Sequence, residues 1–270
     1  MTTTHDLRER AGEEPITMLT DYDTTTARLI DDCGIDVLLV GDSMGTEALG
    51  YDSTLPVTIE EVESRTAAVA RGSDDALVVA DMPFLSVGVD ESETIHNAGR
   101  MLKDAGADAV KLESGPHTVE LTERLTQLGI PVMAHLGLTP QHVNQLGGYT
   151  RQGTTEAAAE KILSLARAHE EAGAFALVLE HVPANVAAQV TDALSIPTIG
   201  IGAGGDCDGQ ALVIGDVLGL NEDTPPFAEE FGDVRAAMTD AIESYKQAVE
   251  TESFPAAEHS HIEEGLDDLS

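Results

Sequence analysis

The sequence has few cysteines, which form disulfides and bind zinc, and few aromatic residues. It contains no Trp, five Phe, four Tyr and two Cys in 270 residues. Cys33 and Cys207 lie far apart and form no CxxC pair, which excludes a disulfide framework and a cysteine-based zinc site. We expect Cys33 to pack as a small apolar side chain.

Basic residues are also scarce. The chain has 14 Lys and Arg against 49 Asp and Glu, a formal charge of -35, and only four lysines. Such a surface repels nucleic acid and anionic membranes, so neither is an expected partner. Because 42% of the residues are hydrophobic, we expect a packed core rather than disorder. We interpret the acidity as adaptation to a cytoplasm of high salt, where cations screen the self-repulsion.

Long apolar runs are missing. No stretch approaches the 18 residues of a membrane span, and the first 14 residues, MTTTHDLRERAGEE, lack the apolar segment of a signal peptide. We therefore expect a cytoplasmic protein.

Eight short apolar runs do recur along the chain, separated by stretches with the length and periodicity of helices. They span residues 16–23, 36–43, 76–83, 108–113, 131–137, 175–180, 197–204 and 212–219. The alternation predicts an α/β fold, a (β/α)8 TIM barrel in a single domain. We expect an N-terminal arm or short helix at 1–15, the barrel with a C-terminal helix at 16–255, and a mobile acidic tail at 256–270.

The fourth run, DAVKLE, carries two charges on one face. Period-two alternation directs Lys111 and Glu113 toward the barrel mouth, and Val110 and Leu112 toward the helices. Charges buried there are costly unless they are paired or liganded, which indicates a functional site. A structural ion pair is the alternative.

Three carboxylates end neighbouring strands. Asp42 and Asp81 follow the second and third runs directly, and Glu113 closes the fourth. Without a cation they would repel one another, and Mg²⁺ suits oxygen ligands that leave positions for a substrate. Helix N-caps are the alternative explanation for each aspartate. Two long connections, 43–58 and 138–153, belong to the same expected face and are typical of functional loops.

Two further strand ends carry reactive side chains. Glu180 ends the otherwise apolar run FALVLE, which suits a general base, with a salt-bridged rim residue as the alternative. His135 could bind a substrate oxygen, cap the barrel interior or ligate a metal. The glycines of 199–210 could cradle a phosphate or simply allow close packing.

The chain resembles the ketopantoate hydroxymethyltransferase family along nearly its whole length. The matching segments are ITMLTDYD, LLVGDSMG, GYDSTLPVT, ADMPF, AVKLE, AHLGLTPQ, GGYTRQG, VLEHVP, IPTIGIGAG and CDGQALVIGDVLG. The resemblance implies a (β/α)8 barrel that transfers a hydroxymethyl group from 5,10-methylenetetrahydrofolate to 3-methyl-2-oxobutanoate, giving 2-dehydropantoate. It also implies a homo-oligomeric ring, a decamer or octamer.

The resemblance also assigns roles. It implies a metal, Mg²⁺, at Asp42, Asp81 and Glu113, substrate binding at Asp42, Ser43, Asp81 and Lys111, and a proton acceptor at Glu180. His135 is a further expected substrate contact. Near Pro225 and Pro226 the acidic PPFAEEF departs from the basic sequence usual in bacterial relatives, so the one-carbon carrier could be a modified pterin instead.

Two other functions stay open from the sequence. A metal-dependent aldolase or lyase acting on an oxoacid without folate would use similar acids, but such enzymes lack the combination of DSTLPVT and HLGLTPQ. A cation-binding scaffold without activity would leave the three carboxylates dispensable.

Overall fold

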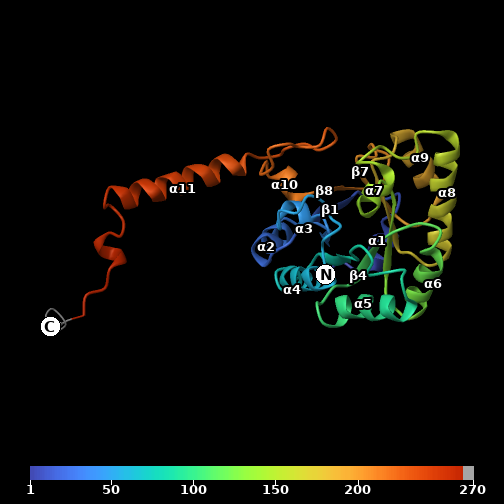
Figure 1. Cartoon of the computed structure of the whole chain (residues 1–270), viewed down its shortest axis with the longest axis horizontal. Coiled ribbons are helices and arrows are strands. Elements are labelled where there is room, and N and C mark those ends of the chain that lie inside the picture. The colour runs from blue at the N-terminus through green and yellow to red at the C-terminus, as the bar shows by residue number, and fades with distance from the viewer. Residues whose placement is uncertain (264–270) are drawn as a thin grey trace. The chain divides into compact units, whose positions relative to one another are not determined.

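Eight parallel strands close into a barrel in chain order, from β1 to β8 and back to β1 (Figure 1). The protein is seen here as a computed structural model that describes residues 1–263. The strands are β1 Ile16–Thr20, β2 Val37–Val40, β3 Leu77–Asp81, β4 Ala109–Glu113, β5 Val132–Gly137, β6 Ala176–Glu180, β7 Thr198–Ile201 and β8 Gly209–Leu212. The predicted (β/α)8 barrel is confirmed.

Alternation along the strands divides the apolar side chains between two cores. Met133 of β5 and Val178 of β6 belong to the cluster inside the barrel. Their neighbours Ala134, Leu177 and Leu179 belong to a second cluster, packed between the strands and the surrounding helices. Both faces of each strand are therefore buried, which is typical of parallel sheets covered by helices.

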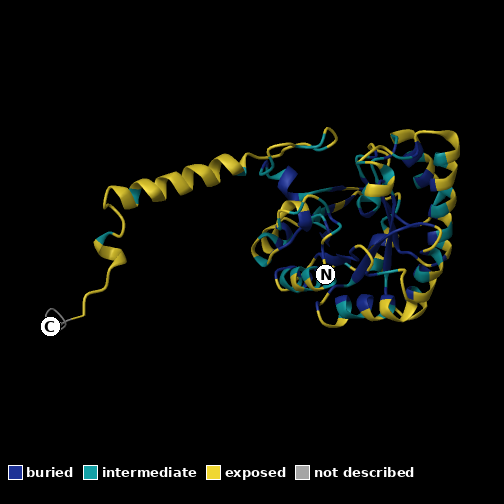
Figure 2. Ribbon diagram, viewed as in Figure 1, coloured by how far each residue is buried: buried dark blue, intermediate teal, exposed yellow. Residues whose placement is uncertain are grey.

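Helices surround the barrel and expose their outer faces (Figure 2). They are α1 Thr4–Glu9, α2 Thr24–Asp32, α3 Met44–Glu47, α4 Ile59–Ala70, α5 Glu91–Lys103, α6 Val119–Gln127, η1 Pro140–His142, α7 Val143–Leu146, α8 Glu156–Glu171 and α9 Ala184–Ala193. Asp23, Thr58, Asp90 and Thr155 accept backbone N–H bonds at helix starts. Such caps satisfy donors that the helix leaves free.

The eighth strand lies earlier than the sequence predicts. The expected run at 212–219 supplies only the last residue of β8, and Ile214–Val217 forms the short helix α10. The strand Gly209–Leu212 has few apolar residues, so its pattern gives no strand signal. Its position depends on pairing with β1, where a Cβ at Gly209 would lie 2.6 Å from the Ile16 carbonyl oxygen.

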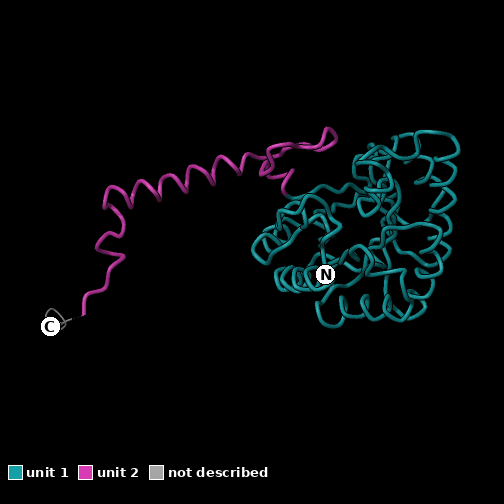
Figure 3. Tube along the Cα trace, in the orientation of Figure 1, with its two compact units in different colours: residues 1–214 teal, residues 215–270 magenta. Residues whose placement is uncertain are grey.

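The described chain divides into two compact units, residues 1–214 and a second unit that begins at Gly215 (Figure 3). The second contains α11 Val234–Glu250, whose Met238, Ile242, Tyr245 and Val249 share one face, and the short η2 Ala257–His259. The assignment of α11 to the same domain as the barrel stays a prediction. Of the expected mobile tail, residues 264–270 lie outside the described part of the chain.

None of the helices in residues 1–263 is long and apolar enough to span a bilayer.

Candidate active site

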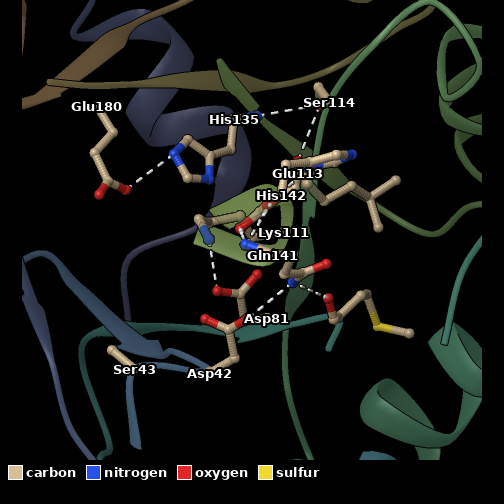
Figure 4. A network of polar contacts seen from close by, with 12 residues as sticks. Asp42, Ser43, Asp81, Lys111, Glu113, Ser114, His135, Gln141, His142 and Glu180 are labelled. Atoms are coloured by element: carbon tan, nitrogen blue, oxygen red, sulfur yellow. Dashed lines mark hydrogen bonds and ion pairs between the residues drawn. The ribbon is translucent and has the colours of Figure 1, made fainter. Parts of the chain in front are cut away.

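A small cavity opens at the carboxyl ends of the strands, where (β/α)8 barrels place their active sites. We call it the mouth cavity; its volume is about 100 Å³. All seven site residues predicted from the sequence line it (Figure 4): Asp42, Ser43, Asp81, Lys111, Glu113, His135 and Glu180. The structure therefore brings together side chains that lie up to about 140 positions apart in the sequence.

Lys111 and Asp81 form a buried ion pair inside this cavity. The Lys111 Nζ lies 2.5 Å from Asp81 Oδ2, and the two residues are 5% and 2% exposed. Burial disfavours the ammonium, but the Asp81 and Asp42 carboxylates outweigh it, so the pKa of Lys111 is raised. The other Asp81 oxygen, Oδ1, is buried without a hydrogen-bond partner among the described residues.

Asp42 lies in the same cluster with too little positive charge around it. Burial and the neighbouring Asp81 raise the pKa of its carboxyl well above the ordinary value, against the opposing effect of Lys111. The Gln141 side chain donates a hydrogen bond of 2.8 Å to Asp42 Oδ2. One lysine thus faces two buried aspartates, which leaves a deficit that a cation would fill.

Glu113 is buried but faces the connection after β5. Its carboxylate accepts the backbone N–H of Gln141 at 3.0 and 3.2 Å. His142 Nδ1 lies 3.3 Å from Glu113 Oε2, and this contact raises the pKa of His142. Glu113 therefore holds the segment above the cavity in place.

Gln141 is a site residue that the sequence reasoning missed. Besides Asp42 and Glu113 it contacts the Met82 carbonyl oxygen, to which its side chain donates at 3.0 Å. It thereby joins the ends of three strands, although it belongs to none of them. The length of the connection 138–153 predicts a functional loop, but the sequence does not show which of its residues reach the site.

Glu180 and His135 form the opposite side of the mouth. In a closed ring of eight strands, β6 lies across from β2, so Glu180 faces the strand after which Asp42 lies. The His135 Nε2 is 3.1 Å from Glu180 Oε2, a close contact whose ring N–H is poorly aligned for a hydrogen bond. The Glu180 side chain is 19% exposed, so a ligand in the cavity can reach it.

Ser43 is held by a buried tyrosine. Its Oγ lies 2.9 Å from the Tyr22 hydroxyl, which also donates to Thr20 at 3.0 Å. Burial raises the pKa of Tyr22, so its hydroxyl stays protonated. Neither Tyr22 nor Thr20 was expected at the site.

The donor set fits Mg²⁺ at Asp42 and Asp81. Both provide hard oxygen ligands, and Asp81 Oδ1 is buried without a partner. Magnesium uses one or two carboxylates and keeps waters or substrate oxygens at its other positions. Within residues 1–263 no three His, Cys, Asp or Glu side chains are grouped to hold a metal together, since Glu113 faces Gln141 and His142.

Three glycines of the segment 199–210, Gly200, Gly204 and Gly209, pack closely against neighbouring atoms. A Cβ at Gly200 would lie 3.1 Å from Cys207 Sγ, and one at Gly204 would lie 2.4 Å from the Ala184 Cβ. Close packing is sufficient to explain why these positions are glycine.

Solved structures share this fold. The chain superimposes on 2,3-dimethylmalate lyase with a TM-score of 0.59 at 16% sequence identity, covering 98% of this chain and 92% of the other. This similarity shows the barrel fold alone.

Sequence relatives are much closer. The 3-methyl-2-oxobutanoate hydroxymethyltransferase of Haloarcula marismortui is 69% identical over 269 residues and is covered completely, as is this chain. The enzyme of the same name from Halobacterium salinarum is 67% identical, covering 95% of this chain and 93% of the relative. A sequence profile described as ketopantoate hydroxymethyltransferase matches residues 1–257. The chain belongs to the ketopantoate hydroxymethyltransferase family.

Proposed function

We propose that the mouth cavity binds 3-methyl-2-oxobutanoate and converts it to 2-dehydropantoate by deprotonation at the branched carbon and attack on a one-carbon unit. The hydroxymethyltransferase activity follows from family membership over the whole chain. The observation that supports this mechanism is that Glu180 lines the same cavity as Lys111 and two buried aspartates, and does so from the strand opposite β2.

The oxoacid binds through its two oxygen-bearing groups. Asp42 and Asp81 would hold Mg²⁺, which supplies a Lewis acid for negative charge developing on the ketone oxygen. Lys111 adds a positive charge for the substrate carboxylate, and Ser43 offers a hydroxyl on the same side. Glu113 contributes to the metal site either as a direct ligand or by holding the segment that carries Gln141 and His142.

Glu180 is the proposed base. Once the oxoacid is fixed by the opposite side of the cavity, its branched carbon extends toward β6, where Glu180 removes the proton. His135, 1% exposed and 3.1 Å from Glu180, lies beside that carboxylate and contacts the substrate. Because the surrounding side chains are buried, little water competes for the proton.

The one-carbon carrier is 5,10-methylenetetrahydrofolate in this proposal, with a modified pterin as the alternative. The attacking carbon forms a bond to the carrier's methylene carbon, and water provides the hydroxyl group of the product. Both carbon–nitrogen bonds that join the methylene carbon to the carrier break, and the carrier leaves as tetrahydrofolate with protons on the two released nitrogens. We further propose that the protein works in the cytoplasm as a homo-oligomer, a decamer or octamer.

Proton exchange in deuterium oxide tests the base directly. We expect Glu180→Gln to bind the oxoacid with and without Mg²⁺ but to lose exchange at the branched carbon, since the amide cannot accept the proton. Glu171→Gln, at an exposed position on α8, is the matched control and should exchange at the wild-type rate. Exchange at the wild-type rate in Glu180→Gln would contradict the assignment.

A product assay separates the transferase from the lyase alternative. The transferase consumes 5,10-methylenetetrahydrofolate together with 3-methyl-2-oxobutanoate, whereas a lyase would cleave an oxoacid without any carrier.

A further inference from the structure

A second, larger cavity lies beside the mouth cavity. We call it the outer cavity; its volume is about 620 Å³, within the usual range for a small-molecule site. Residues after β4 and β5, the segment 139–146 and helix α8 line it, among them His117, His142, Gln145, Gln152, Lys161 and Leu165.

At the ends of two strands, one residue lines the mouth cavity and the next residue along the chain lines the outer cavity. Glu113 at the end of β4 lines the mouth cavity and Ser114 the outer cavity. On β5, His135 lines the mouth cavity and Leu136 the outer cavity. Since successive side chains point to opposite faces of a strand, the two cavities lie on the inner and outer faces of the same strand ends.

The segment above these strand ends separates the cavities. Thr139 and His142 line the outer cavity, whereas Pro140 lines the mouth cavity and Gln141 bonds to Asp42. These four residues therefore lie between a molecule bound in the outer cavity and the mouth cavity.

The charge of the outer cavity is unlike that of the rest of the chain. None of the described residues that line it is Asp or Glu, although the chain has 49 acidic residues. Lys161, one of only four lysines, lines it and forms no ion pair within residues 1–263. His117 lines it from the loop after β4. An anion repelled elsewhere by the acidic surface can be accepted here.

We propose that the outer cavity binds the negatively charged tail of the pterin one-carbon carrier, with Lys161 and His117 beside its carboxylates and its pterin end at the mouth cavity. This rests on the proposed function, which needs a carrier to deliver a carbon next to Glu180. Apolar residues such as Ile162 and Leu165 provide a surface for the aromatic part of the tail.

Paired variants on α8 test the cavity by shape. Ala158 lines the outer cavity, while its neighbour Ala159 lines a different cavity. We expect Ala158→Phe to raise the KM for 5,10-methylenetetrahydrofolate by about tenfold or more, because the larger side chain fills part of the outer cavity and removes contacts with the carrier. The KM for the oxoacid should stay constant in that variant. Ala159→Phe is the control, and both kinetic constants should remain at wild-type values.

Charge reversal tests the anion. We expect Lys161→Glu to raise the KM for the triglutamate carrier by about tenfold and for the monoglutamate by less, because fewer carboxylates are repelled. The tailless carrier 6-methyltetrahydropterin, charged with formaldehyde, should be insensitive to the change. Lys103→Glu, an exposed lysine at the end of α5, is the control. Melting curves establish that each variant is folded.

Carrier KM values unchanged in both Ala158→Phe and Lys161→Glu would overturn the proposal, as would equal effects on tailed and tailless carriers. Proton exchange of the oxoacid by the wild-type protein needs no carrier, so its absence would count against the proposed base and not against the outer cavity.

Discussion

Replacing Lys111 with Met removes the only positive charge that the structure shows bonded to the buried Asp81 carboxylate. Methionine has nearly the same length, so the change deletes the charge and leaves little empty volume. Breaking a buried ion pair by removing one partner costs about 3–5 kcal/mol, because a buried charge is left uncompensated. We expect Lys111→Met to be destabilised by that mechanism when no metal is present.

The pH limits the size of the loss, since a carboxyl can take up a proton instead of remaining charged. Protonating an aspartate of ordinary pKa costs about 4 kcal/mol at pH 7 and about 1.5 kcal/mol at pH 5. The folded variant then holds a proton that the unfolded chain releases, so its stability rises as the pH falls. The pKa of Asp42, which burial and Asp81 raise, likewise makes the folded protein more stable as the pH falls. The expected loss is therefore about 3–4 kcal/mol at pH 7 and about 1–1.5 kcal/mol at pH 5.

Urea unfolding of the metal-free protein at both pH values, at constant salt, measures these losses. Lys103→Met is the control, because Lys103 is exposed and should change the free energy of unfolding by less than about 0.5 kcal/mol. A loss that is the same at pH 5 and pH 7, or below about 1 kcal/mol at pH 7, would refute the reasoning from charge balance.

Three further outcomes are expected. Gln141→Leu removes the hydrogen-bond donor to Asp42 and should weaken Mg²⁺ binding by about tenfold or more in calorimetric titration. Asn144→Leu, at an exposed position on the same segment, is the control and should bind Mg²⁺ as the wild type does. Equal Mg²⁺ affinities in the two variants would exclude a role of Gln141 in orienting Asp42. Burial raises the pKa of Asp21 to about 7, so the wild-type protein loses stability as the pH rises from about 4 to about 7, where the folded state holds a proton that the unfolded chain has released. Asp21→Asn should therefore gain on the order of 3 kcal/mol relative to the wild type between pH 4.5 and pH 8 in urea unfolding. A gain that does not depend on pH would show that Asp21 is not the group involved. Finally, the melting temperature should rise from low to molar KCl, because salt screens the repulsion within a chain of charge -35, and a constant melting temperature would contradict the salt adaptation.

The barrel was predictable because its strands are buried on both faces. Continuous apolar runs such as those ending at Asp81 and Glu180 are visible without knowing which strands pair. The eighth strand was misplaced for the opposite reason. Gly209 and Gln210 carry no apolar signal, and their strand conformation comes from pairing with residues at the other end of the barrel.

The site divides in the same way. Residues at strand ends were predictable, since the fold fixes where a strand end points, and period two assigned Lys111 and Glu113 to the interior. Gln141 was not, because a loop residue shows no periodicity that reveals its contacts with Asp42 and Met82. The direction of Glu113 toward that loop also depends on the tertiary structure.

The pairing of β1 with β8 has a consequence for the synthesis of the protein. Ile16 pairs with Gly209, which lies about 190 residues later in the chain. At about 5–20 residues per second, the ribosome needs on the order of 10–40 s to make the intervening segment. During that interval one edge of β1 stays unpaired on the nascent chain, and such edges can pair with other chains. The acidic surface, which keeps neighbouring nascent chains apart, protects the protein during this period before the barrel closes.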